Sequence, residues 1–362
     1  MTKILFHYPG PFYDELDSGE KKRPKKMREA FEKIGCEVIE CVGDRKTRER
    51  CFSEISRELG TLDFIYSETS TLPLALTEPN HLPKWPCLDY RLFYKARAQR
   101  IPVGVFYRDI YWQFSSFIKS VGILKAVLGR PFYKSELKLY AKTANAVFVP
   151  SNEFGTYLSS ISFERIIALP PGGDVVNFSK KKIELPLRLV YVGAIQPPIY
   201  DLTNLFTELS KLNDIPLTCD IVTKKNEWQK YAAFYDVPSN VRITHLVGVE
   251  VENLLKECHI SLLYFNDDPY RHIAQPLKLY EAVGFGLPLV TREGTSAASV
   301  IMENQFGWVI GGEINLLGSL LKRLVENLDE VNRIARNVWN QRHLHTWEAR
   351  ARKALEILTR AT

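Results

Sequence analysis

The stretch that decides the fold lies between residues 273 and 290 and reads IAQPLKLYEAVGFGLPLV. Apolar residues recur at helical spacing after Pro276, a residue that suits the first turn of a helix. The helical pattern ends at Gly-Leu-Pro, and an apolar β-branched run follows directly. A helix that leads into a buried strand is the repeating unit of a parallel α/β sheet. We therefore expect α/β architecture on both sides of this stretch.

Strand and helix patterns alternate through the whole chain. The first half opens with a strand pattern, a helix pattern at 25–35 and a second strand pattern, which together begin a parallel sheet. The predicted strands are 3–9, 36–42, 62–67, 102–107, 146–151, 187–193, 217–223, 241–247, 260–265, 287–291 and 307–312. A short basic run at 180–182 separates the two halves. We predict two Rossmann-like domains, 1–180 and 184–340, with a cleft at the carboxyl ends of the strands.

Composition places the chain among ordinary globular proteins. Of 362 residues, 45% are hydrophobic and 25% are charged. No segment approaches the ~20 consecutive apolar residues that span a bilayer. The first residues lack the apolar stretch of a signal peptide, and the six cysteines form no Cys-x-x-Cys pair. These features predict a cytoplasmic protein with reduced thiols.

Positive charge is concentrated in the first half, where residues 1–180 hold 27 Lys and Arg against 21 Asp and Glu. Between Lys119 and Lys142 there are six basic residues and one acidic residue. In the same region, 111–142, apolar residues follow helical spacing: Phe114, Phe117, Ile118 and Val121. This pattern fits a helix on an anionic membrane surface, and equally a core-facing helix with a basic outer face. No motif indicates nucleic-acid binding.

Two charged residues interrupt the apolar pattern of the opening stretch. Lys278 would lie in the first turn of the helix, where free backbone N–H groups favour an anion such as phosphate. Glu281 would lie one turn further on the same face, where a carboxylate can hold ribose hydroxyls. The spacing is equally typical of an i,i+3 ion pair on a surface helix.

The stretch PLKLYEAVGFGLPLV resembles the donor-site segment of glycosyltransferases with the GT-B fold, of the bacterial polysaccharide type in family 4. Those proteins share a Glu that opens a helix of small and apolar residues, then Gly-x-Pro and a strand. Further resemblances follow the family's order along nearly the whole chain: AVFVPSNEFGTYL, ALPPGGDVVNF, VRITHLVGVEVENLLKECHISLLYF and MENQFGWVI. HTWEARARKAL resembles the family's terminal helix, which implies that 341–362 packs back on the first domain.

The resemblance implies a hexosyltransferase that takes a sugar from a nucleotide-diphosphate sugar, with a UDP sugar expected. The acceptor would be a glycan or a lipid-linked saccharide in surface polysaccharide biosynthesis. No cofactor and no metal are expected, because basic side chains and helix amides would neutralise the leaving diphosphate. The protein would then work in the cytoplasm, free or on the inner face of a membrane.

The same resemblance assigns residues to the donor. Glu281 would bind the ribose, Lys278 the diphosphate, and Gly193 would let the backbone approach the donor. The full donor set is Gly193, Lys224, His245, Arg271, His272, Lys278 and Glu281. Ordinary structural roles remain open for several of them: a strand-end turn, a solvated lysine, a structural histidine or a loop charge.

On the acceptor side, Asp109 is the candidate general base and Arg108 a candidate binding residue, since both follow a predicted strand. An ion pair between the two, or across the loop, is the alternative. In the loop SGEKKRP, the candidate acceptor residues are Ser18, Gly19 and Arg23; a solvated basic loop is the alternative.

Two positions depart from the family pattern. Ile273 stands where many retaining members have a second glutamate, so retention or inversion stays open. GAIQPPIYD, residues 193–201, lacks the Arg and Lys that many members carry there. Two other functions therefore stay open. One is a UDP-sugar epimerase or phosphorylase of the same fold, and the other is a non-catalytic partner of an active transferase.

Overall fold

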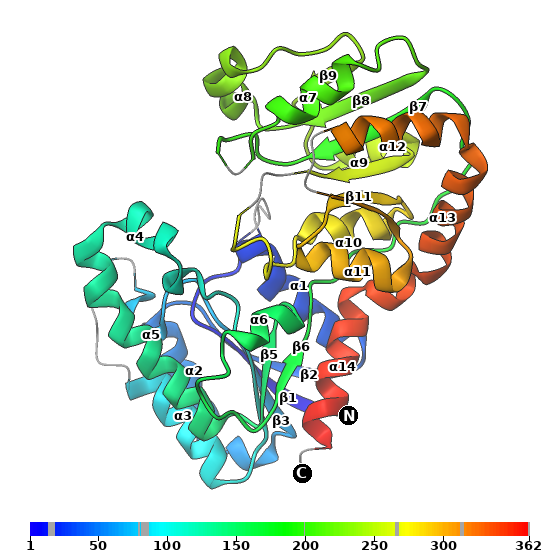
Figure 1. Cartoon of the computed structure of the whole chain (residues 1–362). Coiled ribbons are helices and arrows are strands. Elements are labelled where there is room, and N and C mark those ends of the chain that lie inside the picture. The colour runs from blue at the N-terminus through cyan, green and yellow to red at the C-terminus, as the bar shows by residue number, and fades with distance from the viewer. Residues whose placement is uncertain are drawn as a thin grey trace. The chain divides into compact units, whose positions relative to one another are not determined.

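The computed structural model describes residues 1–13, 19–78, 80, 87–198, 200–264, 268–311 and 315–360. The chain forms two compact units, which are Met1–Pro171 with Trp347–Thr362 (unit 1) and Gly172–Thr346 (unit 2). Each unit contains one parallel sheet with helices packed against it (Figure 1). The predicted α/β class with two Rossmann-like units is confirmed. Among the described residues, no helix is long and apolar enough to cross a lipid bilayer.

The sheet of unit 1 has the strand order β2-β1-β3-β4-β5-β6 and is parallel throughout. Its strands are β1 (Lys3–Tyr8), β2 (Glu37–Val42), β3 (Phe64–Glu68), β4 (Val103–Phe106), β5 (Ala146–Val149) and β6 (Ile166–Ala168). The first five match predicted strands. The edge strand β6 was not predicted, because three residues are too short to show a periodic pattern.

The helices of unit 1 follow the strands in the order that a doubly wound sheet requires. They are α1 (Gly19–Lys33), α2 (Arg45–Ile55), α3 (Cys87–Ala98), α4 (Ser115–Val121), α5 (Ile123–Thr143), α6 (Asn152–Thr156) and α14 (Trp347–Thr359). Short 3-10 turns are η1 (Leu59–Thr61), η2 (Leu74–Leu76) and η3 (Tyr111–Gln113). In sequence, α1 is followed at once by β2, a β-α-β opening that places both strands in one parallel sheet.

The helix α1 begins earlier than predicted, which moves Arg23 from a loop onto a helix. The polar pattern predicted a loop through Pro24 and a helix from residue 25, whereas the structure begins the helix at Gly19. Proline removes one backbone hydrogen bond and crowds the preceding turn. We attribute the continuation through Pro24 to its buried neighbours: Arg23 is 4% exposed and Met27 is fully buried.

The sheet of unit 2 is also parallel, with the strand order β12-β11-β10-β7-β8-β9. Its strands are β7 (Leu187–Val192), β8 (Leu217–Val222), β9 (Val241–Thr244), β10 (Ile260–Leu263), β11 (Leu289–Arg292) and β12 (Gly307–Ile310). Its helices are α7 (Thr203–Ser210), α8 (Lys225–Tyr231), α9 (Val249–Glu257), α10 (Leu277–Gly284), α11 (Ser296–Asn304), α12 (Asn315–Glu326) and α13 (Leu328–Gln341). The 3-10 turns are η4 (Ala232–Phe234) and η5 (Arg342–His345).

The boundaries between the units lie at 171/172 and 346/347, whereas the sequence analysis placed them at 180–184 and 340/341. The segment 172–183 belongs to unit 2 because its backbone bonds there. Val176 N donates to Gly284 O at 3.2 Å. Ile183 N donates to the side-chain oxygen of Asn332 at 2.9 Å. The basic run at 180–182 is therefore part of unit 2 and not a linker.

The terminal helix α14 packs on unit 1, against α1 and β4 (Figure 1). A close approach makes this possible: a Cβ atom on Gly104 of β4 would lie 2.7 Å from Leu358. Polar contacts fix the helix further, since Lys353 Nζ donates to Ala168 O at 2.9 Å. A side chain larger than hydrogen at position 104 would push the helix off the sheet.

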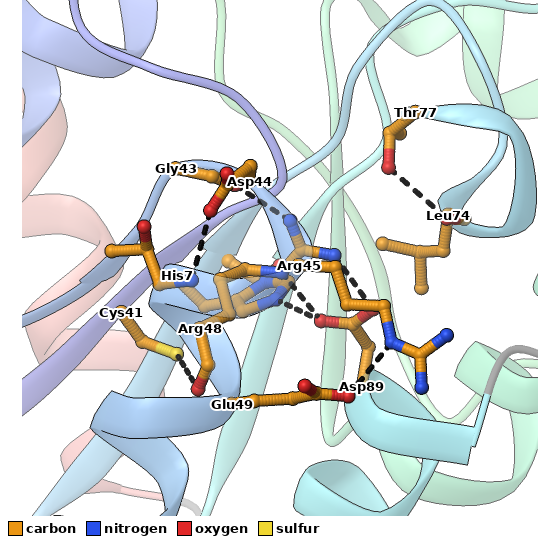
Figure 2. Close-up of polar contacts among 12 residues, drawn as sticks. His7, Cys41, Gly43, Asp44, Arg45, Arg48, Glu49, Leu74, Thr77 and Asp89 are labelled. Atoms are coloured by element: carbon orange, nitrogen blue, oxygen red, sulfur yellow. Dashed lines mark hydrogen bonds and ion pairs between the residues drawn. The ribbon is translucent and has the colours of Figure 1, made fainter. Parts of the chain in front are cut away.

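A buried polar network ties β1, α2 and α3 of unit 1 together (Figure 2). His7 Nε2 lies 2.9 Å from Asp89 Oδ1, and Arg48 donates to both carboxylate oxygens of Asp89 at 3.0 and 3.1 Å. On its other side, His7 Nδ1 lies 2.8 Å from Ser67 Oγ. This is the residue set of a hydrolase triad, but none of its three members is more than 4% exposed. A substrate cannot reach a hydroxyl buried in this way, so the network stabilises the fold.

Candidate functional site

Three candidate donor residues follow three neighbouring strands of unit 2. Gly193 comes directly after β7, Lys224 two residues after β8, and His245 directly after β9. Because β7, β8 and β9 are adjacent and parallel, these positions meet at the carboxyl edge of the sheet. Open α/β sheets bind their ligands at this edge.

Backbone contacts explain part of this arrangement without a ligand. His245 Nδ1 lies 3.0 Å from Thr223 O and so joins the ends of β8 and β9. Gly193 N donates to Val222 O at 3.0 Å, which continues the β7–β8 pairing. A Cβ atom at Gly193 would lie 3.1 Å from the Tyr191 hydroxyl, so a larger residue would have to displace that ring.

Arg271 lies against the loop that follows β7. Its guanidinium stacks over the Tyr200 ring, 4.6 Å from the centroid, and Nη2 donates to the Tyr200 hydroxyl. Burial lowers the pKa of Arg271 from its usual value, partly offset by Tyr191. The contacts with Tyr200 hold the Arg271 side chain beside the loop that follows β7. His272 follows in the same turn and is half-buried.

Lys278 and Glu281 lie on α10, as predicted, but they contact each other. Lys278 Nζ lies 2.7 Å from Glu281 Oε2. The ion pair is one of the two alternatives that the spacing left open, and the structure, which holds no ligand, leaves donor binding by these residues a prediction. The lysine side chain is 46% exposed and the glutamate 21%. An exposed pair of this kind contributes only about 0.3–0.5 kcal/mol, so a ligand can displace it readily.

The apolar face of α10 is buried, which explains the rest of the opening stretch. Leu279, Tyr280 and Val283 are fully buried in the core of unit 2. A Cβ atom at Gly284 would lie 2.2 Å from Asp174 O, so only glycine lets the segment 172–183 cross this close. Pro276 caps the helix, and Lys278 is the second helical residue. Ile273 is 2% exposed and packs as a core residue, where a glutamate would require a buried partner.

In unit 1, three charged residues gather at the carboxyl edge of the sheet. Glu68 ends β3, Arg108 lies two residues after β4, and Arg23 reaches them from α1. Arg23 Nε donates to both Glu68 oxygens at 3.0 and 3.1 Å. Arg108 Nη2 lies 3.9 Å from Glu68 Oε2. Arg23 and Arg108 were candidate acceptor residues, and the structure brings them to one buried carboxylate.

Asp109 and the loop candidates have simpler surroundings. Asp109 Oδ1 accepts a hydrogen bond from Tyr111 N at 2.7 Å and so begins the turn η3. Arg108 lies near Glu68, so the cross-loop ion pair is the alternative that the geometry favours for it. Gly19 opens α1, and Ser18 lies outside the described residues.

The apolar residues of 111–142 divide into two groups at Gly122, whose φ of 86° ends α4 before α5 begins. Phe114 packs on Tyr157 at 5.6 Å between ring centroids, and Phe117 packs on Tyr133 at 6.3 Å. These aromatic rings face unit 1 itself. These contacts favour the core-facing alternative for the two phenylalanines.

A different apolar surface occupies the first turns of α5. Its four members are 58–71% exposed: Ile123, Leu124, Val127 and Leu128. We call these four residues the α5 patch. Lys119 and Lys125 lie beside it in sequence and are exposed. Contiguous exposed aliphatic residues bordered by lysines are typical of a binding surface.

Three residues near the candidate sites were missed by the sequence analysis. Glu68 appeared as an ordinary strand end, and Tyr200 lay in a loop with no recognised motif. Thr295, which caps α11 by accepting a hydrogen bond from Ala298 N at 3.1 Å, lies after β11 at the same edge as the donor candidates. The run Gly-Thr-Ser after a predicted strand could have indicated this helix start.

Among the described residues, no group of three or more His, Cys, Asp or Glu lies in a metal-binding arrangement. Five cysteines are free thiols, at positions 36, 41, 51, 219 and 258.

Two Rossmann-like units, each built on a parallel sheet, are the two-domain architecture of the GT-B fold, and the terminal helix belongs to the first unit. No protein-family model and no curated protein matches the sequence. Solved structures do match over the full length. HepE from Anabaena, solved with UDP and glucose, has 13% identity and a TM-score of 0.62, covering 99% of this chain and 100% of its own.

Two further structures cover both units. WaaG, described as a glycosyltransferase involved in lipopolysaccharide biosynthesis, has 15% identity and a TM-score of 0.57, with 99% and 100% of the two chains covered. Sucrose-phosphate synthase from Thermosynechococcus elongatus has 11% identity and a TM-score of 0.60, with 99% of each chain covered. These similarities establish the fold of this chain as GT-B, in agreement with the prediction.

Proposed function

We propose that this protein is a glycosyltransferase that moves a sugar from a nucleotide-diphosphate sugar, in the first instance a UDP sugar, to an acceptor hydroxyl. The observation that carries the proposal is the full-length likeness to HepE, which was solved with UDP and glucose and with UDP-glucose. Three candidate donor residues of unit 2 support it, since Gly193, Lys224 and His245 follow adjacent parallel strands and so lie at the edge where open α/β sheets bind ligands.

In this proposal Lys278 exchanges Glu281 for the donor diphosphate, and Glu281 accepts the ribose hydroxyls. The bond between the sugar and the diphosphate oxygen breaks, and a glycosidic bond to the acceptor oxygen forms. Positive charge on Lys278 and the first amides of α10 stabilise the leaving diphosphate, so the reaction needs no metal. Asp109 is the candidate base that takes the acceptor proton.

The proposed acceptor is a glycan or a lipid-linked saccharide, as in surface polysaccharide assembly. The α5 patch supports a lipid-linked acceptor, because it could hold unit 1 on the inner face of an anionic membrane. Exposed aliphatic side chains would enter the interface while the adjoining lysines meet anionic headgroups. No nucleic acid is proposed as a partner.

The direct test incubates the purified chain with UDP sugars and saccharide acceptors in the presence of EDTA. We expect release of UDP together with a lengthened saccharide. Conversion of the UDP sugar without an acceptor would instead identify an epimerase. UDP binding with no transfer to any acceptor would identify a non-catalytic protein.

A further inference from the structure

The cluster of Arg23, Glu68 and Arg108 in unit 1 has an unbalanced charge. Two guanidinium groups share one carboxylate, which leaves one net positive charge. Glu68 is fully buried, the Arg23 side chain is 4% exposed and the Arg108 side chain is 10% exposed. A buried net charge is costly unless an opposite charge accompanies it.

The hydrogen bonds of the cluster are also incomplete. Arg23 uses Nε for Glu68, and the Tyr66 hydroxyl donates to the same carboxylate at 2.8 Å. Within this cluster, four guanidinium nitrogens are buried without a hydrogen-bond partner among the described residues: Arg23 Nη1 and Nη2, and Arg108 Nε and Nη2. Buried polar groups in proteins nearly always have partners, so unfilled donors indicate a ligand.

Rigid packing orients these donors. The Arg23 guanidinium lies over the Phe106 ring, 3.3 Å from its centroid, and Glu68 holds its Nε edge. Arg108 N donates to Thr69 Oγ1 at 3.0 Å, which fixes the loop that carries the second arginine. Arginine side chains held in this way offer planar forks that match the oxygens of a phosphoryl group.

We propose that Arg23 and Arg108, positioned by Glu68, form a binding site for a phosphoryl group in unit 1, and that the acceptor carries this group. The assignment to the acceptor rests on the proposed transferase activity, whereas phosphoryl binding itself does not. The donor diphosphate is the other source of the same chemistry, and the test below separates the two.

The test measures binding of inorganic phosphate to the full chain by calorimetry. Arg108→Gln should weaken binding about tenfold, because a charge-assisted contact is lost. Glu68→Gln should instead strengthen it, because the amide keeps an oxygen that accepts from Arg23 Nε while the competing negative charge is removed. Arg28→Gln is the matched control, because Arg28 lies on the same helix α1 but pairs with Glu32. This variant should bind phosphate as tightly as the wild type does.

Opposite shifts in two variants cannot come from misfolding, and circular dichroism will verify that each variant is folded. The proposal is overturned if the wild type binds no phosphate, or if the Arg108 and Glu68 variants bind it unchanged. If the site serves the phosphoryl group of the acceptor, saturating UDP should leave the binding of inorganic phosphate unchanged. Displacement by UDP would overturn the acceptor assignment and support the donor diphosphate as the occupant of the site.

Failure of this site and failure of the proposed function are distinguishable. A chain that binds phosphate as described but transfers no sugar keeps the site and loses the transferase activity. A chain that transfers sugar but binds no phosphate keeps the activity and loses the site.

Discussion

Lys278 Nζ lies 2.7 Å from Glu281 Oε2, one helical turn apart on α10. The pair is exposed enough that it contributes about 0.3–0.5 kcal/mol to stability, far less than a diphosphate bound to the same lysine would. Because the pair is weak, exchanging one partner for another costs little, which is compatible with the proposed donor role. Both residues lie in the first two turns of α10, the helix that follows β10 in the chain.

Glu281→Gln should therefore separate stability from ligand binding. We expect the free energy of unfolding to change by no more than about 1 kcal/mol, because the amide keeps the shape of the side chain and the ion pair with Lys278 is partly exposed. UDP binding should weaken about tenfold, because an amide replaces the carboxylate that accepts two ribose hydroxyls. Calorimetry with UDP and urea unfolding measure the two quantities. Glu303→Gln, on the exposed face of α11, is the control; equal UDP affinity in both variants would contradict the ribose assignment.

Asp89→Asn should destabilise unit 1 strongly. Burial opposes ionisation of Asp89, but the hydrogen bond from His7 and the charge of Arg48 outweigh it and hold its pKa well below the usual value. The neutral amide leaves Arg48 buried without its counterion, which costs about 3–5 kcal/mol. Urea unfolding at pH 7 measures the change. Asp44→Asn, at the exposed cap of α2, should cost no more than about 1 kcal/mol.

The raised pKa of Glu136 predicts that the stability of the fold decreases as the pH rises. Burial raises its pKa to about 7, partly offset by hydrogen bonds from Tyr140 and the backbone of Leu74. A carboxyl with a raised folded pKa stabilises the fold below its unfolded pKa of 4.5, and this contribution is lost as pH rises through about 7. The loss is about 3 kcal/mol at most.

Glu136→Gln should remove this dependence, because the amide mimics the protonated acid. We expect the variant to unfold at higher urea than the wild type at pH 8, with little difference at pH 4.5. Unfolding curves at both pH values test the sign. A wild type whose stability rises between pH 5 and 8 by the amount that Glu136→Gln abolishes would show that the carboxyl is ionised in the fold.

The α5 patch predicts binding to anionic membranes. Replacing Leu124 and Leu128 with serine should reduce cosedimentation with phosphatidylglycerol vesicles at least fivefold, because about 0.8 kcal/mol is lost for each buried methylene. Both side chains are more than 60% exposed, so the fold should be unaffected. Vesicles of phosphatidylcholine, which lack net charge, should bind the wild type more weakly. Equal sedimentation of the variant and the wild type would exclude the patch as the membrane surface.

Much of the fold could be predicted from the sequence, because strand and helix patterns alternate so regularly. The strands from β1 to β5 and from β7 to β12 match predicted runs, with ends shifted by a few residues. The edge strand β6 and the early start of α1 were missed. The strand β6 has only three residues, which are too few to show a period of two. The segment before Pro24 is polar, so it shows no helical pattern until its buried partners are known.

The candidate sites were predicted only in part. Lys224 and His245 were assigned from the resemblance, and the structure places both after strands that end at one edge of the sheet, while their role stays a prediction. The contact between Arg23 and Glu68 could not be found, because it joins residues 45 positions apart through tertiary packing. The helical spacing of Phe114, Phe117, Ile118 and Val121 was recognised, but the more exposed apolar side chains lie on α5, beyond the end of α4 at Gly122, and only the structure shows this.

The central claim is that α10 holds the diphosphate of a nucleotide-sugar donor. Its most direct test is calorimetric titration of UDP into the wild type, Lys278→Ala and Lys322→Ala, where Lys322 is an exposed lysine on α12 of the same unit. The account predicts UDP binding by the wild type and the Lys322 variant, and at least tenfold weaker binding by the Lys278 variant with an unchanged melting temperature. Equal UDP affinity in all three proteins, or no UDP binding by the wild type, would contradict it.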